Sequence, residues 1–274
     1  GIRDVERSRG LGDVYKRQIY NFLQLREIFH LEFLRWLSRK IKPSYYALKG
    51  GVNLRFFFRS LRYSEDMDLD IQAVKVEILQ DIVMKILSSS SFQNILKPFG
   101  IERIIPPDIT KAKQTQTTQR FKIHLIASEG EDLFTKLEFS RRGFKGEILI
   151  EPVSSNILRE YKLPPLLVPH YALSSAINQK IEALSTRAIV QARDIFDLYI
   201  LSSQISPFQL KEIKISESQI KKVVENIFQI DFEQFRDVVV NYLLEEEQKV
   251  YDSKGLWDEI RLKTVSFIEN LKNE

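Results

Sequence analysis

Apolar residues recur at helical spacing near the start of the chain. Between Ile19 and Lys40 they form one continuous face, which is the pattern of an amphipathic helix, and Pro43 follows its end. The apolar positions of this face are Phe22, Leu25, Phe29, Phe33, Trp36 and Leu37. The pattern therefore predicts a long helix over residues 19–40.

Short segments typical of β-strands follow this helix. The run YYALKGG reads as a strand entering a tight turn, and Met67 to Ile71 reads as a strand whose apolar and acidic residues alternate. Between them, residues 52–58 are predicted to form a short helix, and residues 74–87 a longer one. The other β-prone stretches are residues 101–105, 120–127, 133–140 and 147–151.

Helical periodicity dominates the sequence that follows Pro164, Pro165 and Pro169. The predicted helices are residues 171–184, 191–203, 217–228, 231–248 and 256–271. The chain thus divides into an α/β half, residues 19–160, and a helical half, residues 161–274. The proline-rich stretch 161–169 is the predicted joint between them.

Residues 1–18 share none of these patterns. They are rich in charge and glycine, resemble translated adaptor sequence, and are excluded from the fold prediction as a non-native or disordered leader. The segment holds five of the 41 basic and three of the 37 acidic residues, so without it the net charge falls from +4 to +2. The overall charge is therefore no argument for nucleic-acid binding, which must rest on local clusters.

Two absences from the sequence exclude whole classes of protein. Without cysteine, the chain has no disulfide, no thiolate nucleophile and no zinc–cysteine site. No stretch approaches the roughly 18 apolar residues of a membrane-spanning helix, and the charged N-terminus lacks the apolar run of a signal peptide. We expect a cytoplasmic protein with no membrane partner.

Two neighbouring segments carry candidate chemistry. Gly50 and Gly51 lie between a predicted strand and helix, where the missing Cβ atoms let backbone N–H groups and a helix N-terminus approach a phosphate. Along the next strand, Asp66, Asp68 and Asp70 alternate and so point to one face, about 6.5 Å apart. Carboxylates at this spacing can converge on Mg²⁺.

Each feature alone also has a structural interpretation. A strand–Gly–Gly–helix turn is most often only a turn, and a row of acids can mark a solvated edge strand. Together they favour a site, because the 14 residues between Gly51 and Asp66 suffice for a short helix and a return strand. Phosphoryl and nucleotidyl transfer need phosphate donors and metal-binding carboxylates side by side.

At these segments the sequence resembles the AbiEii/AbiGii toxin family of nucleotidyltransferases, within the DNA polymerase β-like superfamily. The family pattern is Lys-Gly-Gly-Thr followed by Arg-x-Ser-Glu-Asp-φ-Asp, and this chain has KGGV (49–52) and RYSEDMD (62–68). The resemblance implies that Asp66 and Asp68 hold metal ions and that Gly50 and Gly51 hold the triphosphate. The nucleotide-binding residues that it implies also include Lys49 and Ser64.

One position departs from the family pattern. Val52 stands where the family has Thr or Ser, so a phosphate-binding hydroxyl is missing. Two interpretations are open: the Asn53 side chain donates instead, or activity is weaker.

A third carboxylate and a second block of residues complete the resemblance. Polymerase-β-like enzymes take a further acid from a later strand, and Glu138 is the candidate here, as an alternating residue in KLEFS. The block NQKIEALSTRAIVQARDIFDLYIL (178–201) resembles a family segment in which Lys180 binds phosphate and Asp194 is a further catalytic acid. By the same resemblance Arg187 and Arg193 support the nucleotide, although charges such as Arg193 and Asp197 also suit an ordinary intrahelical pair.

The resemblance implies an α+β fold, with a polymerase-β-like nucleotidyltransferase core on a mixed sheet followed by a C-terminal helical bundle. It implies a toxin of a toxin–antitoxin or phage-defence system that uses Mg²⁺ or Mn²⁺ and an NTP, with tRNA as a candidate acceptor and a cognate antitoxin as partner. Two alternatives remain: the same chemistry on a small-molecule or protein acceptor, and a nucleotide-binding regulator without transferase activity, which Val52 suggests.

Overall fold

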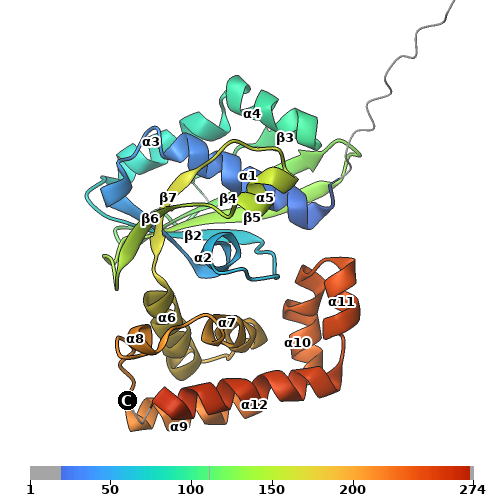
Figure 1. Ribbon diagram of the computed structural model, residues 1–274. Coiled ribbons are helices and arrows are strands. Elements are labelled where there is room, and N and C mark those ends of the chain that lie inside the picture. Colours follow the sequence, from blue (N-terminus) through green and yellow to red (C-terminus); the bar gives the residue numbers. More distant parts are fainter. Residues whose placement is uncertain (1–19, 111, 272–274) are drawn as a thin grey trace, which may run out of the picture.

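A seven-stranded mixed sheet forms the first half of the computed structural model, which describes residues 20–110 and 112–271 (Figure 1). The strand order is β3-β4-β5-β2-β1-β7-β6; the β2–β5 and β1–β7 pairs are parallel and the others antiparallel. The strands are β1 (Tyr46–Lys49), β2 (Asp66–Ile71), β3 (Ile101–Ile105), β4 (Thr118–Ala127), β5 (Asp132–Ser140), β6 (Ile148–Pro152) and β7 (Leu167–Tyr171).

Helices cover the two faces of the sheet differently. Helices α1 (Phe22–Leu37), α3 (Val76–Leu87) and α4 (Ser90–Leu96) lie over one face, and α5 (Ser155–Glu160) lies near its edge (Figure 1). Helix α1 begins at Asn21, whose side chain accepts from the backbone N–H of Gln24 while the Gln24 side chain accepts from the Asn21 N–H. On the opposite face, α2 (Gly50–Phe57) packs over β1 and β2, while the β4–β5 part of that face carries exposed and half-buried side chains.

The second half of the molecule is a helical bundle below α2 (Figure 1). It contains α6 (Leu173–Thr186), α7 (Ala192–Ser202), α8 (Pro207–Leu210), α9 (Glu217–Phe228), α10 (Phe232–Val238), α11 (Glu245–Tyr251) and α12 (Lys254–Asn270). Short 3-10 turns occupy Pro43–Tyr45, Lys97–Phe99 and Val240–Tyr242. Within the described residues, no helix has both the length and the apolar character needed to cross a membrane.

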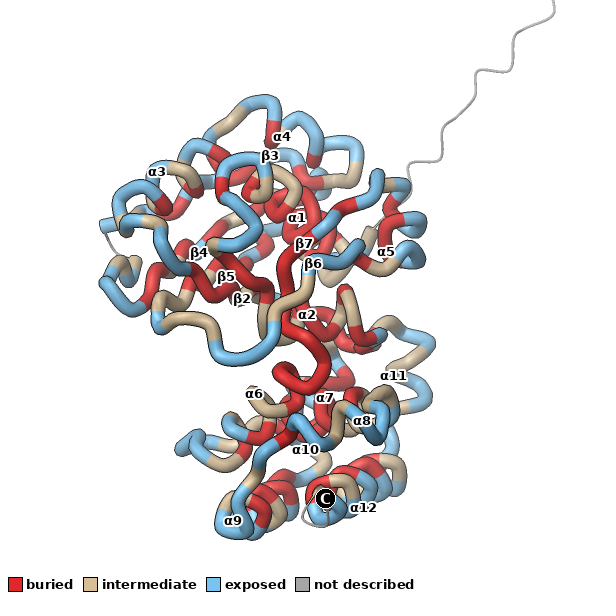
Figure 2. Tube along the Cα trace, turned by 60° about the vertical axis from the view of Figure 1, so that its left-hand side comes forward, coloured by how far each residue is buried: buried red, intermediate tan, exposed pale blue. Residues whose placement is uncertain are grey.

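Helix α2 and the chain after β7 join the two halves. Val52 and Phe56 of α2 belong to the hydrophobic core of the sheet half, whereas Leu54 belongs to that of the bundle. Every residue from 168 to 177 is buried, and Figure 2 shows this buried path running from β7 into α6. The two halves are therefore packed on one another and not merely tethered.

The predicted fold class is confirmed, and most predicted elements lie within a few residues of their observed positions. The stretch predicted as the joint, residues 161–169, is not a connection outside the sheet. It contains most of β7, and the sheet extends to Tyr171. Pro169 lies inside this strand. Because proline has no N–H to donate to a sheet, its presence in the sequence disfavours the prediction of a strand here. The predicted leader, residues 1–18, lies outside the described residues.

The continuous helix predicted over 231–248 is wrong. The chain forms α10, a 3-10 turn and α11 instead. The break falls at Val239, whose φ of −124° leaves the helical region, and the side chains of Val239 and Val240 are buried in the bundle core. Tertiary packing thus overrides the helical periodicity at this point.

Candidate active site

The acidic residues of β2 meet those of β5 on the open face of the sheet. These two strands are parallel neighbours, and their register places Asp66 beside Lys136 and Asp68 beside Glu138. Side chains alternate along a strand, so all four belong to the same face. The structure therefore brings Glu138, predicted from a separate segment, next to the Asp66–Asp68 pair.

Asp68 is the electrostatically strained member of this group. Burial raises the pKa of the Asp68 carboxyl, and the nearby carboxylates of Glu138 and Asp66 raise it further, against the opposing charges of Lys49 and Lys136. Among the described residues, no hydrogen bond or ion pair engages the Asp68 side chain. A divalent cation would relieve this repulsion, and carboxylate oxygens are the ligands that Mg²⁺ and Mn²⁺ prefer.

The neighbouring acids are held by cations from the protein itself. Asp66 lies 2.8 Å from Lys136 Nζ, and Glu138 lies 2.6 Å from Arg120 Nε. As they stand, no three acidic or histidine side chains in the described part of the chain converge as a metal site. Asp68 thus fits a metal ion by ligand type and position, whereas Asp66 and Glu138 become available as ligands when their pairs with Lys136 and Arg120 open.

Asp70, the last acid of the alternating row, has a structural role. It is buried, and its two carboxylate oxygens accept from Lys49 Nζ and from the Tyr171 hydroxyl, both at 2.5 Å. Lys49, predicted to bind nucleotide, therefore neutralises Asp70 at the wall of the site. The contact with Tyr171 also fixes β2 against β7.

The two glycines pack directly against the acidic strand. Gly50 has a φ of +67°, and a Cβ atom there would lie 2.8 Å from Asp68 Oδ2. A Cβ atom on Gly51 would lie 2.8 Å from the Ser64 hydroxyl, which itself donates to the backbone oxygen of Asp66 at 2.8 Å. Only glycine permits this approach, which brings the N-terminus of α2 to the carboxylates.

A buried network of charges forms the opposite wall, on α6 and α7. Lys180 Nζ lies 2.8 Å from Asp194 and 2.6 Å from Asp197, and Asp194 also pairs with Arg187. Burial by itself lowers the pKa of Lys180, but the two aspartates raise it above its ordinary value, so the ammonium stays charged. Asp197 pairs with Arg62 of the sheet half and not with Arg193, so the intrahelical pair is not formed.

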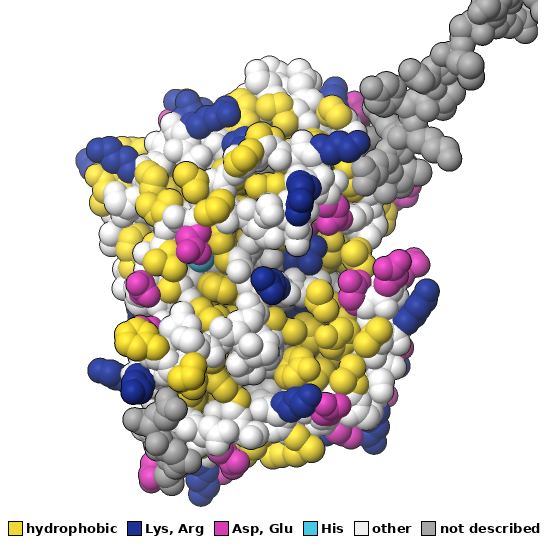
Figure 3. Space-filling view, in the orientation of Figure 1, with side chains coloured by type: hydrophobic (Ala, Val, Ile, Leu, Met, Phe, Trp, Pro, Cys, Tyr) yellow, Lys and Arg dark blue, Asp and Glu magenta, His cyan; other side chains and the backbone are white. Residues whose placement is uncertain are grey.

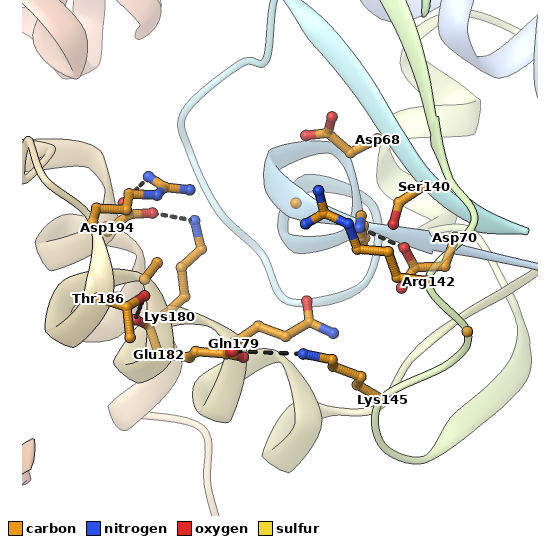
Figure 4. A pocket seen from close by; sticks show the side chains of 15 residues that line it. Asp68, Asp70, Ser140, Arg142, Lys145, Gln179, Lys180, Glu182, Thr186 and Asp194 are labelled. Carbon is orange, nitrogen blue, oxygen red and sulfur yellow. Dashed lines mark hydrogen bonds and ion pairs between the residues drawn. The ribbon is translucent and has the colours of Figure 1, made fainter. Parts of the chain in front are cut away.

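Two adjoining cavities, of about 360 and 530 Å³, lie between these walls. Figure 4 shows Asp68 and Asp70 of the sheet facing Lys180 and Asp194 of the helices across the smaller one. Eleven of the twelve predicted site residues line one or both cavities: Lys49, Gly50, Gly51, Ser64, Asp66, Asp68, Glu138, Lys180, Arg187, Arg193 and Asp194. The fold therefore gathers into one cleft residues that are far apart in the sequence.

Asn53 is the predicted residue that the structure places elsewhere. It is buried, its amide donates to the Tyr171 backbone oxygen at 3.1 Å, and its side-chain oxygen lies 3.0 Å from His170 Nδ1. Asn53 therefore ties α2 to β7 and does not replace the missing hydroxyl. Val52 fills a position in the sheet-side core, with 2% of its surface exposed.

Several cleft residues went unrecognised in the sequence. Arg120 and Lys136 contact the carboxylates, and Lys145 reaches from the loop after β5 to Glu182 on α6 at 3.6 Å (Figure 4). For Lys136 a signal existed, because strand alternation puts it on the same face as Glu138. For Arg120 the sequence holds no such signal, because its position beside Glu138 depends on how β4 pairs with β5.

A mixed sheet that carries paired carboxylates beside a glycine turn, opposed by a helical wall with a charged lysine, brings together the groups that nucleotidyl transfer needs. The sequence matches the family described as nucleotidyl transferase AbiEii toxin, type IV toxin–antitoxin system, over residues 32–254. The chain belongs to this family and is a toxin nucleotidyltransferase.

Solved structures share the fold across nearly the whole chain. A candidate nucleotidyltransferase from H. pylori superposes with a TM-score of 0.58 at 17% identity, covering 93% of this chain and 96% of its own. MenT4, a nucleotidyltransferase toxin from Mycobacterium tuberculosis, gives 0.56 at 17% identity, covering 90% and 84%. JHP933 from Helicobacter pylori gives 0.53 at 18%, covering 93% and 94%. No curated protein matches the sequence significantly.

Proposed function

We propose that this toxin transfers a nucleoside monophosphate from an NTP to the 3′ end of tRNA, with Mg²⁺ or Mn²⁺ bound by Asp66, Asp68 and Glu138. The observation that carries the proposal is the position of Asp68. Its carboxylate lies among Asp66 and Glu138, has a raised pKa, and lies beside the Gly50 turn. Such crowding is costly unless a cation is bound.

Each wall of the cleft has a separate task in this reaction. A divalent ion held by Asp66 and Asp68 would supply charge neutralisation at the attacked phosphorus and would polarise the acceptor hydroxyl. The backbone N–H groups at Gly50 and Gly51, at the start of α2, orient the triphosphate. Lys180 and Arg187 oppose its negative charge from the helical wall. The acceptor oxygen bonds to the α-phosphorus as the bond to pyrophosphate breaks.

The local charge of the cleft supports an RNA acceptor. The larger cavity is lined by six cationic side chains, those of Arg62, Arg120, Lys136, Lys180, Arg187 and Arg193, and by five acidic ones, those of Glu65, Asp66, Asp68, Glu138 and Asp194. On the face drawn in Figure 3, Lys and Arg are instead scattered over both halves among acidic and apolar side chains. The cleft thus brings together cationic side chains that a phosphate group can contact.

The proposed partner, besides NTP and tRNA, is an antitoxin, because the family description places these toxins in a type IV toxin–antitoxin system.

Label transfer tests the proposal directly. Each α-³²P-NTP is incubated with total bacterial tRNA and Mg²⁺, with wild-type protein and with the double variant Asp66→Ala/Asp68→Ala. We expect label on tRNA from at least one NTP with wild type and none with the variant. Label on protein or on a small molecule in place of tRNA would overturn the assignment of the acceptor.

Removal of divalent metal tests the cofactor separately. EDTA is expected to abolish transfer, and Mg²⁺ or Mn²⁺ in excess is expected to restore it in wild type. Transfer that persists in EDTA after extensive dialysis would show that Asp66 and Asp68 act without a metal.

A further inference from the structure

An exposed aromatic pair lies on the open face of the sheet, next to the cleft. Phe134 of β5 is 60% exposed, and its ring stacks on that of His124 in β4, with centroids 4.6 Å apart and planes inclined by 21°. His124 Nε2 in turn lies 2.5 Å from Asp132 Oδ1, which fixes the orientation of the ring. A single exposed apolar side chain is ordinary on a protein surface, but this ring is held by its stack on His124 and so offers a fixed aromatic surface to the solvent.

The arrangement of the lysines beside this pair does not stabilise the sheet. Lys122 and Lys136 are directly opposite one another in the β4–β5 ladder, and like charges in that relationship destabilise a sheet. Lys136 is compensated by Asp66. Lys122 is exposed, and within residues 20–110 and 112–271 no ion pair engages it. The unmatched charge suits an anionic ligand.

The same face leads directly into the catalytic cleft. Along β5, Phe134, Lys136 and Glu138 occupy alternate positions, and Glu138 stands beside Asp68. At about 3.4 Å per residue, Phe134 lies roughly 14 Å along the strand from the carboxylates. A single-stranded nucleic acid that crosses this face would pass over the aromatic pair and the lysines before its end reached the cleft.

We infer that the β4–β5 face, formed by Arg120, Lys122, His124, Phe134 and Lys136, binds the unpaired 3′ segment of the acceptor RNA. A base stacks on the Phe134 ring, and the phosphates beside it contact Lys122 and Lys136. Aromatic side chains on an open sheet, flanked by cations, are a general solution to binding single-stranded RNA. This inference rests on the proposed function and adds the surface that positions the acceptor.

The charge of the face favours RNA over a protein partner. Three of its five named residues are cationic. Arg120 is paired with Glu138 and Lys136 with Asp66, whereas Lys122 has no acidic partner among the described residues. A phosphate group complements this uncompensated charge. An antitoxin docked there is an alternative that the experiment separates.

The test measures RNA binding without turnover, in the Asp66→Ala/Asp68→Ala background, by fluorescence anisotropy of labelled tRNA with and without its unpaired 3′ nucleotides. Phe134→Ala is expected to weaken binding of intact tRNA about tenfold, the usual size of one lost base stack, and to leave binding of the shortened tRNA unchanged. Phe134→Leu, which keeps an apolar side chain, should behave like alanine, and Phe134→Trp should retain binding. Phe208→Ala, at an equally solvent-facing Phe (77% exposed) on α8, is the matched control and should have no effect.

The variant Lys122→Glu provides an independent measurement, because it removes one phosphate contact and should reduce the salt dependence of tRNA binding. Each further substitution should leave nucleotide binding as it is in the Asp66→Ala/Asp68→Ala background, which excludes unfolding. Equal tRNA affinity for Phe134→Ala and wild type would overturn the inference while label transfer by wild type left the proposed function intact. Absence of both tRNA binding and labelling by wild type would overturn the two together. Loss of antitoxin binding alone in Phe134→Ala would assign the face to the antitoxin.

Discussion

The guanidinium group of Arg62 lies 3.2 Å from the carboxylate of Asp197, and both side chains are buried. Arg62 precedes β2 in the sheet half, whereas Asp197 belongs to α7 in the bundle, so the pair crosses between the two walls of the cleft. Asp197 also holds Lys180 at 2.6 Å. The Asp197 carboxylate therefore links the packing of the two halves to the position of Lys180, which faces the candidate nucleotide site.

Removing Asp197 is therefore expected to destabilise the whole protein. Asp197→Ala leaves the charges of Arg62 and Lys180 buried with too few partners, and breaking such a pair costs about 3–5 kcal/mol. The free energy of unfolding in urea measures the loss. Asp81→Ala, which breaks the exposed pair of Asp81 with Lys85 on α3, is the control and should cost no more than about 0.5 kcal/mol. Equal effects of the two substitutions would contradict the role of the Arg62–Asp197 pair.

The Asp197 carboxylate should also make the stability of the protein depend on pH. Burial raises the pKa of Asp197, but the charges of Arg62 and Lys180 outweigh it and hold the pKa below its ordinary value of about 4. A depressed pKa contributes stability that is present above pH 4 and is lost as the pH falls through the lower, folded-state pKa. The difference in unfolding free energy between wild type and Asp197→Asn should thus shrink on acidification below pH 4. Urea titrations at pH 7, 5, 4 and 3 check this, and a constant difference would refute it.

Asp68→Asn is predicted to abolish transfer while stabilising the metal-free protein. The substitution removes a partly buried charge whose neighbours Asp66 and Glu138 repel it, and it also removes a metal ligand. Without metal, the melting temperature of the variant should exceed that of wild type, whereas Mg²⁺ should raise the melting temperature of wild type alone. A variant less stable than wild type in EDTA would show that Asp68 has a structural role.

Gly50→Ala is predicted to remove activity out of proportion to its effect on stability. The left-handed φ costs about 1–2 kcal/mol for any residue with a Cβ, and this Cβ would also push against Asp68 Oδ2. Gly130→Ala, at a turn with φ of +90° and no atom within 4 Å of the added carbon, carries the strain without the contact. Both variants should lose similar unfolding free energy, and only Gly50→Ala should lose transfer by two orders of magnitude or more. Similar activities of the two would show that the close approach of Gly50 to Asp68 is unimportant.

Much of the site followed from local patterns in the chain. Alternation along β2 puts Asp66, Asp68 and Asp70 on one face whatever surrounds them, because side chains in a strand repeat every second residue. The glycine pair marks a turn for an equally local reason, since only residues without Cβ allow Gly50 its φ of +67°. Most helices and the carboxylates and glycines of the site could therefore be predicted from local patterns, whereas the fold class and the roles of Lys180 and Asp194 came from the family resemblance.

What each residue does in the site depended on contacts between distant segments. Asp70 looks the same as Asp68 in the sequence, and only the proximity of Tyr171 and Lys49 shows that its charge is already compensated. Asn53 looked like a phosphate donor beside the glycines, but its helix turns it toward His170.

The sequence by itself determined the chemical groups and their spacing along each element, since these depend on backbone periodicity alone. The tertiary structure decided which carboxylates are neutralised, which cations line the cleft, and that the proline-containing segment 167–171 joins the sheet as β7. Those outcomes depend on strand order and on the burial of paired charges. Both are set by packing between distant segments, such as those of Arg62 and Asp197, which are 135 positions apart.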